Sequence, residues 1–71
     1  MKYDSEKAVF AALLTKPTEL WFLKYVAKET QLSEIHVMRC LRQLEEDGFV
    51  ESVQTGIICP QYLAIGYKVR P

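Results

Sequence analysis

The chain has 71 residues, of which 49% are hydrophobic, and its nine basic residues balance nine acidic ones. We expect residues 1–71 to form a single domain with a small core. The apolar runs are too short to span a membrane and the N-terminus lacks the apolar stretch of a signal peptide, so we expect a cytoplasmic protein with no membrane partner. Because the formal net charge is zero, binding to any acidic partner must depend on where individual cations lie.

The two cysteines, Cys40 and Cys59, do not form a CxxC pair. Together with the single histidine they provide too few ligands for a four-coordinate zinc site, so we expect neither a metal nor another cofactor. In a reducing compartment they should be free thiols that behave as small hydrophobic side chains, and an intersubunit or redox-sensing role is the alternative. No nucleophile with an orienting base and no glycine-rich phosphate loop is recognisable, so we expect no enzyme and no small-molecule substrate.

A helix is predicted over residues 4–14. Asp4 or Ser5 is expected to cap its first turn, and Pro17 ends it because the residue before proline avoids helical backbone. The apolar residues at helical spacing form one face: Val9, Phe10, Leu13 and Leu14.

Residues 18–23 allow two interpretations. In the first, Thr18 caps a helix that includes the whole segment. In the second, residues 20–22 form a short strand and the helix begins directly after it. We favour the strand, because the unbroken aromatic and apolar run is typical of one and would give the C-terminal strands a third partner. In both interpretations Val26 and Ala27 lie on the inward face of a helix that ends near residue 30.

The clearest pattern predicts a helix over about Ser33–Asp47, preceded by a turn at residues 31–33. Ser33 is a good N-cap, and Gly48 stands where a left-handed residue is expected to end the helix. Its apolar residues recur at i, i+3, i+4 and i+7 and form one buried stripe: Val37, Cys40, Leu41 and Leu44.

Two strands are predicted at the C-terminal end, over residues 49–53 and residues 61–69. Residues 54–56 (Gln-Thr-Gly) are a turn signal, and Cys59-Pro60 indicates irregular backbone because proline cannot donate to a strand ladder. The fold class is therefore α+β and mainly α, with three helices, a short strand near Leu20–Phe22 and a C-terminal β-hairpin.

The segment YVAKETQLS at residues 25–33, followed by EIHVMRCLRQLEEDGFV at residues 34–50, resembles the winged helix-turn-helix of MarR- and ArsR-type transcription regulators. Members carry patterns such as ELAEELGLS and xxxVSRHLxxLExxGLV. The resemblance covers about residues 5–69, and the size is similar to that of the small pilus phase-variation regulators. It implies a sequence-specific regulator that places the Ser33–Asp47 helix in the major groove of double-stranded DNA, with the hairpin as the wing. The chain departs from the pattern at Gln31, where most members carry glycine.

A helix in the major groove buries one face and offers the other to the DNA. Arg39 and Arg42 suit guanine edges or phosphates, Gln43 suits adenine, and Ser33 with the helix N-terminus suits a phosphate. The residues we expect to contact DNA are those of this outward face and two lysines of the preceding helix: Ser33, Glu34, Ile35, His36, Met38, Arg39, Arg42, Gln43, Lys24 and Lys28.

Other interpretations remain open at this stage. In one interpretation, Arg39 and Arg42 pair with acidic residues of their own helix. In another, His36 is an exposed polar residue without a role in binding. The segment 54–61 contains no basic residue, although wings that bind DNA usually carry one. A winged helix that binds protein instead of DNA is therefore the alternative function, with an apolar contact patch: Ile35, Met38, Ile57 and Ile58.

We also expect a homodimer, because a single domain of this size offers DNA only about 600–1,000 Å² of contact. Aromatic residues expected at the surface are candidates for the subunit contact: Tyr3, Trp21 and Tyr62.

Overall fold

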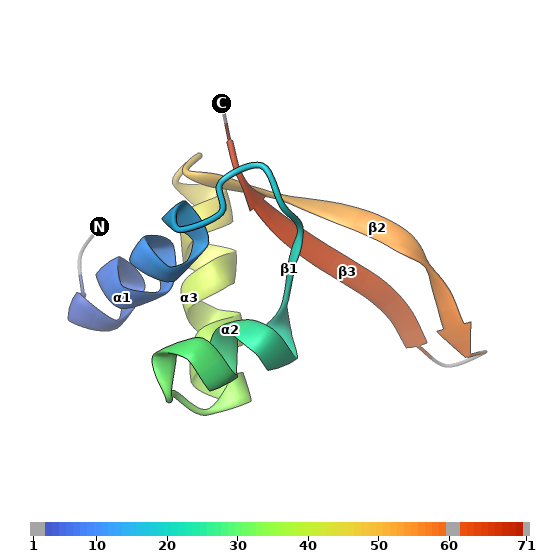
Figure 1. Ribbon diagram of the computed structural model, residues 1–71, viewed down its shortest axis with the longest axis horizontal. Coiled ribbons are helices and arrows are strands. Elements are labelled where there is room, and N and C mark those ends of the chain that lie inside the picture. The colour runs from blue at the N-terminus through green and yellow to red at the C-terminus, as the bar shows by residue number, and fades with distance from the viewer. Residues whose placement is uncertain (1–2, 60–61, 71) are drawn as a thin grey trace.

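The computed structural model describes the backbone of residues 3–59 and 62–70, and the side chains of residues 3–54 and 65–70. Within these ranges the elements follow the predicted order: α1 (Asp4–Leu14), β1 (Trp21–Phe22), α2 (Leu23–Thr30), α3 (Glu34–Glu46), β2 (Val50–Cys59) and β3 (Tyr62–Val69). The three helices pack together, and the β2–β3 hairpin extends away from them as an arm (Figure 1). None of the helices in this part of the chain is long and apolar enough to cross a membrane.

The start of α1 differs from the prediction. Tyr3 is the N-cap, with extended backbone (φ −121°, ψ 151°), so Asp4 and Ser5 are already helical and neither caps the helix. The Glu6 carboxylate instead reaches back and accepts a hydrogen bond from the Tyr3 backbone N–H (3.0 Å). A carboxylate in the first turn also complements the positive end of the helix dipole.

The buried residues of α1 also differ from the predicted ones at some positions. Val9 and Leu13 are fully buried and Phe10 is partly buried, as expected, but Leu14 is 48% exposed. Ala12 and Glu6 are buried in its place, at 8% and 3% exposed. The buried stripe therefore follows the i, i+3, i+7 positions from Glu6, and Leu14 lies beyond its edge at the last helical residue.

The strand interpretation of residues 20–22 is correct for Trp21 and Phe22. They pair with Tyr67 and Gly66 of β3, and α2 begins directly afterwards. Gly66 permits this pairing, because a Cβ there would lie only 3.2 Å from the Cβ of Leu20. A side chain at this position of β3 would force Leu20 to shift by a few tenths of an ångström.

The turn between α2 and α3 contains the left-handed residue that MarR- and ArsR-type regulators usually build with glycine. Gln31 adopts the left-handed conformation (φ 61°, ψ 28°), which is uncommon for a residue with a side chain. Ser33 is the N-cap of α3, as predicted, and its hydroxyl accepts a hydrogen bond from the His36 backbone N–H (3.2 Å). Gly48 ends the helix with φ 85°, also as predicted.

The core is centred on α3. The four residues of its predicted stripe are between 0% and 4% exposed, and they join buried residues from α1, α2 and β2 in one cluster. Its members are Val9, Leu13, Val26, Ala27, Val37, Cys40, Leu41, Leu44 and Val50. The prediction that Val26 and Ala27 face inward is confirmed.

The sheet has the order β1-β3-β2, with antiparallel pairing throughout the described strands. The turn predicted at residues 54–56 is wrong, because β2 continues through them to Cys59. The pairing register shifts between Gln54 and Gly56 and again between Ile57 and Cys59. Glycine is typical of bulges as well as of turns, and here the chain inserts an extra residue into the strand without reversing.

We expect Gln31→Gly to raise the free energy of unfolding by about 1 kcal/mol, because it removes the crowding that a side chain causes in left-handed backbone. Urea denaturation measures the change. The matched control is Gly48→Ala, which introduces that crowding and should lower the free energy of unfolding by about 1 kcal/mol. A loss of stability in Gln31→Gly would contradict the conformation described at this turn.

Candidate nucleic-acid interface

The outward face of α3 carries a row of three exposed side chains. Ile35, Arg39 and Arg42 lie at i, i+4 and i+7, opposite the buried stripe of the same helix. Ile35 is 63% exposed, which is unusual for a large aliphatic side chain that no neighbour covers. We call Ile35, Arg39 and Arg42 the outer row.

Neither arginine of the outer row has an acidic partner among the residues that the structure describes. The described residues form one ion pair, between Lys68 of β3 and Glu51 of β2, with 3.2 Å between Lys68 Nζ and Glu51 Oε1. Neither of these residues belongs to α3. The interpretation in which Arg39 and Arg42 pair with acids of their own helix is therefore wrong. Their guanidinium groups keep their donors available to a ligand.

The other predicted contact residues of α3 differ in how accessible they are. Ser33, Glu34 and His36 are exposed near the start of the helix, whereas Met38 is partly buried. Gln43 is exposed, but its amide donates a hydrogen bond to the Asp47 carboxylate (3.1 Å). The exposed face from Ser33 to Arg42 is thus the part of α3 that is open to a partner.

The C-terminal end of α3 is fixed to the sheet. The Glu45 carboxylate accepts hydrogen bonds from the Ser52 backbone N–H (3.2 Å) and from the Ser52 hydroxyl of β2. No sequence pattern predicts this contact, because it joins residues of two separate elements. It holds one acidic side chain against the hairpin, at a distance from the start of the helix.

The cations of the described hairpin lie at its base, where Arg70 follows β3 and reaches Gly48 at the end of α3. Lys68 is engaged with Glu51, and Gln54 is the last exposed side chain described on β2. Several predictions about the wing, the apolar patch, the thiols and the dimer concern side chains that lie outside the described residues. These side chains are those of Thr55, Ile57, Ile58, Cys59, Gln61 and Tyr62.

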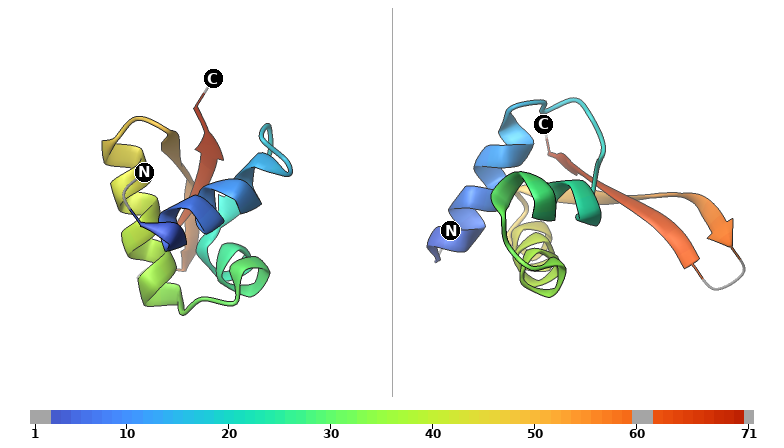
Figure 2. Two further views of the ribbon diagram at one scale, coloured as in Figure 1. Left: turned by 90° about the vertical axis from the view of Figure 1, so that its left-hand side faces the viewer. Right: turned by 60° about the horizontal axis from the view of Figure 1, so that its bottom comes forward.

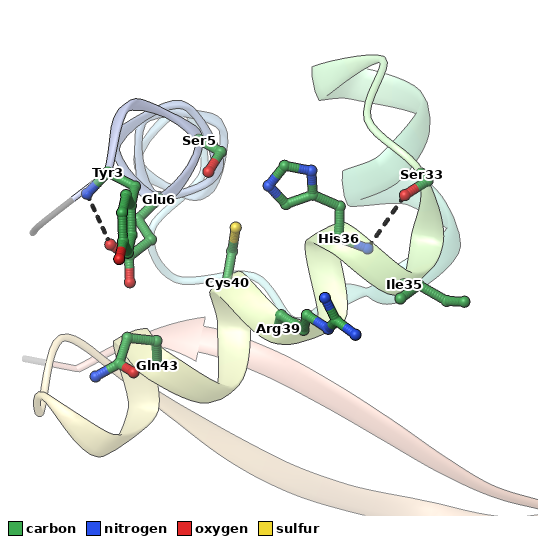
Figure 3. Close-up of a pocket in the computed structure, with 9 residues that line it drawn as sticks. All are labelled: Tyr3, Ser5, Glu6, Ser33, Ile35, His36, Arg39, Cys40 and Gln43. Atoms are coloured by element: carbon green, nitrogen blue, oxygen red, sulfur yellow. Dashed lines mark hydrogen bonds between the residues drawn. The ribbon is translucent and has the colours of Figure 1, made fainter.

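A cleft of about 650 Å³ separates the start of α1 from α3, and no sequence pattern predicted it. Figure 3 shows the Cys40 side chain directed toward α1, with Glu6 on that helix and His36 and Arg39 on α3. The Cys40 thiol is free and only 4% exposed, in line with a small hydrophobic side chain. No group of three metal-ligating side chains converges here or elsewhere among the described residues.

The two lysines of α2 are both exposed. Lys28, but not Lys24, lines a second cleft of about 520 Å³ formed with the loop after α1. Trp21, which we expected to be exposed, is partly buried: its ring packs on the core and its N–H donates to the Lys16 carbonyl (3.3 Å). Tyr3 is 61% exposed, as expected.

One titratable group lies at the junction of α3 and the sheet. Burial raises the pKa of the Tyr67 hydroxyl above its ordinary value, the Glu45 carboxylate raises it further, and the Arg42 guanidinium lowers it. Arg42 is therefore close enough to this junction to act on Tyr67 through space.

We expect the folded chain to lose stability at alkaline pH as Tyr67 ionises. The folded state holds this proton more tightly than the unfolded state, so the stabilisation is complete below about pH 10 and is lost as the pH rises through the raised pKa. In urea denaturation at about pH 9 and about pH 11, Tyr67→Phe should lose less stability between the two values than the wild type. Tyr25→Phe, which removes a hydroxyl from an exposed ring, is the control. Equal losses in all three proteins would contradict this role of Tyr67.

No protein-family model and no curated protein matches the sequence. Among solved structures, the fold is similar to that of a protein from Methanosarcina mazei Go1 described as a possible transcriptional regulator, with a TM-score of 0.87 and 17% sequence identity. The match covers 97% of this chain and 57% of that protein, so this chain spans little more than half the length of its structural neighbour. At this identity the similarity shows the fold, which is α+β and of the winged-helix type.

Proposed function

We propose that this chain is a sequence-specific transcription regulator of the MarR/ArsR-like winged-helix type that binds double-stranded DNA in the cytoplasm. The observation that carries the proposal is the outer row of α3. It presents two arginines that have no acidic partner in the described part of the chain, on a helix whose opposite face is buried in the core. A helix of this form fits the major groove of B-DNA, which is wide enough to admit it.

Each residue of the outer row has chemistry that suits a base edge or a phosphate. Arg39 and Arg42 present the planar donors that pair with the N7 and O6 atoms of guanine or with phosphate oxygens. Ile35 suits the methyl group of thymine. Ser33 and the free N–H groups of the first turn lie at the positive end of the helix dipole, where a phosphate is stabilised.

The charges along α3 favour entry of its N-terminal end into the groove. Glu46 continues the outer row one turn after Arg42, and Asp47 holds the Gln43 amide. Carboxylates repel phosphates, so the C-terminal end of the helix must lie away from the DNA backbone. We assign the base contacts to the segment from Ser33 to Arg42, which spans about two and a half turns, with Glu34, His36 and Met38 at the margins.

Phosphate contacts outside α3 come from α2 and not from the wing. Lys24 and Lys28 are exposed on the helix that precedes the turn, and the described part of the hairpin offers only cations at its base. With Arg39 and Arg42 they make four cations. The slope of log K against log salt concentration is about −2 when only the two lysines contact phosphates, and about −3 to −4 when all four cations do.

We expect the chain to enrich a common motif from random double-stranded DNA, and fluorescence anisotropy on that motif to give the expected salt slope between about 50 and about 200 mM salt. Arg39→Ala combined with Arg42→Ala should weaken binding at least tenfold, because each bidentate contact with guanine contributes about 1–3 kcal/mol. It should also reduce the salt slope by up to about two, depending on how many of the two contacts are to phosphate.

The matched control is Lys7→Ala combined with Arg70→Ala, which removes the same charge from exposed positions outside α2 and α3. It should bind nearly as tightly as the wild type. Equal binding by the wild type and the α3 double variant, even at low salt, would refute the proposal. If the chain then captured a stoichiometric protein partner in the absence of nucleic acid, and Ile35→Ser abolished the capture, the protein-binding alternative would replace it.

A further inference from the structure

The two arginines of the outer row lie toward opposite sides of α3. At 3.6 residues per turn, Arg39 and Arg42 are about 60° apart around the helix axis. Arg39 lines the cleft between α1 and α3, and the lining of that cleft does not include Arg42. In the right view of Figure 2, α1 and the hairpin lie on opposite sides of α3. Arg39 is therefore on the α1 side of the helix and Arg42 is on the side of the sheet.

The sheet brings Tyr67 close to Arg42. Ser52 of β2 and Tyr67 of β3 are partners in the strand register. The Ser52 backbone N–H donates to the Glu45 carboxylate of α3 (3.2 Å). Glu45 follows Arg42 by three residues, so the two side chains are neighbours on the same side of the helix. The effects of Glu45 and Arg42 on the pKa of the Tyr67 hydroxyl agree with this proximity.

Two hydrogen-bond donors are available at this junction of α3 with the sheet. The Tyr67 ring packs against the core, but its hydroxyl makes no hydrogen bond with another described residue. The hydroxyl is open to solvent, because no buried polar side-chain atom in the described part of the chain lacks a partner. Arg42 is exposed, and it has no acidic partner among the same residues. A guanidinium and a hydroxyl that point to one place are suited to hold an anion.

The one carboxylate beside this pair is engaged elsewhere. Both the backbone N–H and the hydroxyl of Ser52 donate to Glu45 Oε2, which draws that carboxylate toward β2. A glutamate three residues after an arginine is otherwise well placed to pair with it on the helix surface. Ser52 therefore helps to keep the Arg42 guanidinium available to a ligand.

The shape of B-DNA assigns different partners to the two sides of a helix in the major groove. Base edges form the floor of the groove, and the sugar-phosphate backbones form its walls. Tyr67 belongs to the sheet and not to the helix that enters the groove, so its hydroxyl meets a backbone before it meets a base. Tyrosine hydroxyls and arginines are both common donors to DNA phosphates.

Building on the proposed function, we infer that Arg42 and Tyr67 together hold one phosphate of the DNA backbone between α3 and the sheet, and that Arg39 is the arginine that reads a base. Phosphate contacts position a protein on the duplex and base contacts specify the sequence. This site therefore sets the register at which Arg39 meets the bases. With the two lysines of α2 it makes three cationic phosphate contacts, which give a salt slope of about −3.

Single variants of the full chain separate the two roles. Fluorescence anisotropy is measured at about pH 7 on the enriched motif and on its single-base variants. Arg42→Ala should weaken binding to all of these sequences by the same factor and make the salt slope less negative by about one. Arg39→Ala should relax the preference at one base pair and leave the slope unchanged.

Tyr67→Phe keeps the ring in the core and removes only the hydroxyl. It should weaken binding about two- to tenfold on every sequence, as expected for one hydrogen bond. The salt slope should stay the same, because a neutral hydroxyl displaces no counterion. Tyr25→Phe, on the outer side of α2, is the matched control and should bind as the wild type does. Circular dichroism confirms that all variants fold.

Duplexes with one neutral methylphosphonate, moved along the motif, locate the phosphate itself. At one position the replacement should weaken binding by the wild type, and there Arg42→Ala and Tyr67→Phe should bind no more weakly than the wild type. If no position silences both substitutions, the shared phosphate site is refuted. A relaxed base preference in Arg42→Ala would also overturn the inference, because it makes this arginine a base reader.

The proposed function and this inference fail in different ways. A wild type that binds no double-stranded DNA even at about 50 mM salt refutes the proposed function, and the phosphate site with it. If the wild type enriches a motif and depends on Arg39 and Arg42, but Tyr67→Phe binds as tightly as the wild type, the proposed function holds and the inference is wrong.

Discussion

The buried stripe of α3 is the contact on which the rest of the molecule depends. Val37, Cys40, Leu41 and Leu44 are almost inaccessible, and they pack against residues from α1, α2 and β2 together. Fully burying a side chain of this size contributes about 1.5–3 kcal/mol. The neighbouring elements α1, α2 and β2 all pack against one side of this thirteen-residue helix, so none of them covers its other side. The exposure of the outer row is thus a direct consequence of how this small core is assembled.

The two ends of α3 are held by different means, and together they fix the direction in which the outer row points. At the start, the left-handed backbone of Gln31 and the Ser33 cap set the angle at which the chain enters the helix. At the end, Gly48 turns the chain into β2, and Glu45 binds Ser52 across the junction. A helix fixed at both ends is suited to present donors at constant positions, as base recognition requires.

The elements that could be predicted are those whose signal is local. Helical periodicity and capping located α3 to within one residue at each end, because Ser33 and Gly48 lie next to the residues they affect. The bulge at Gly56 was mistaken for a turn, since glycine serves both and only the pairing with β3 distinguishes them. Two features of the site depend on contacts between distant segments. These are the lack of acidic partners for Arg39 and Arg42 among the described residues, and the two clefts. Such contacts leave no periodic trace in a single sequence.

The absence of a side chain at Gly66 has a consequence that extends beyond the sheet. Leu20 rests where a Cβ would project, so β3 and the segment that leads into β1 are in direct contact. Any larger residue at this position would press on Leu20, which would have to give way by a few tenths of an ångström. Leu20 is itself 38% exposed, so the shift would reach the surface. A mutation on the central strand would thereby change the outer surface of the protein without altering a single surface residue.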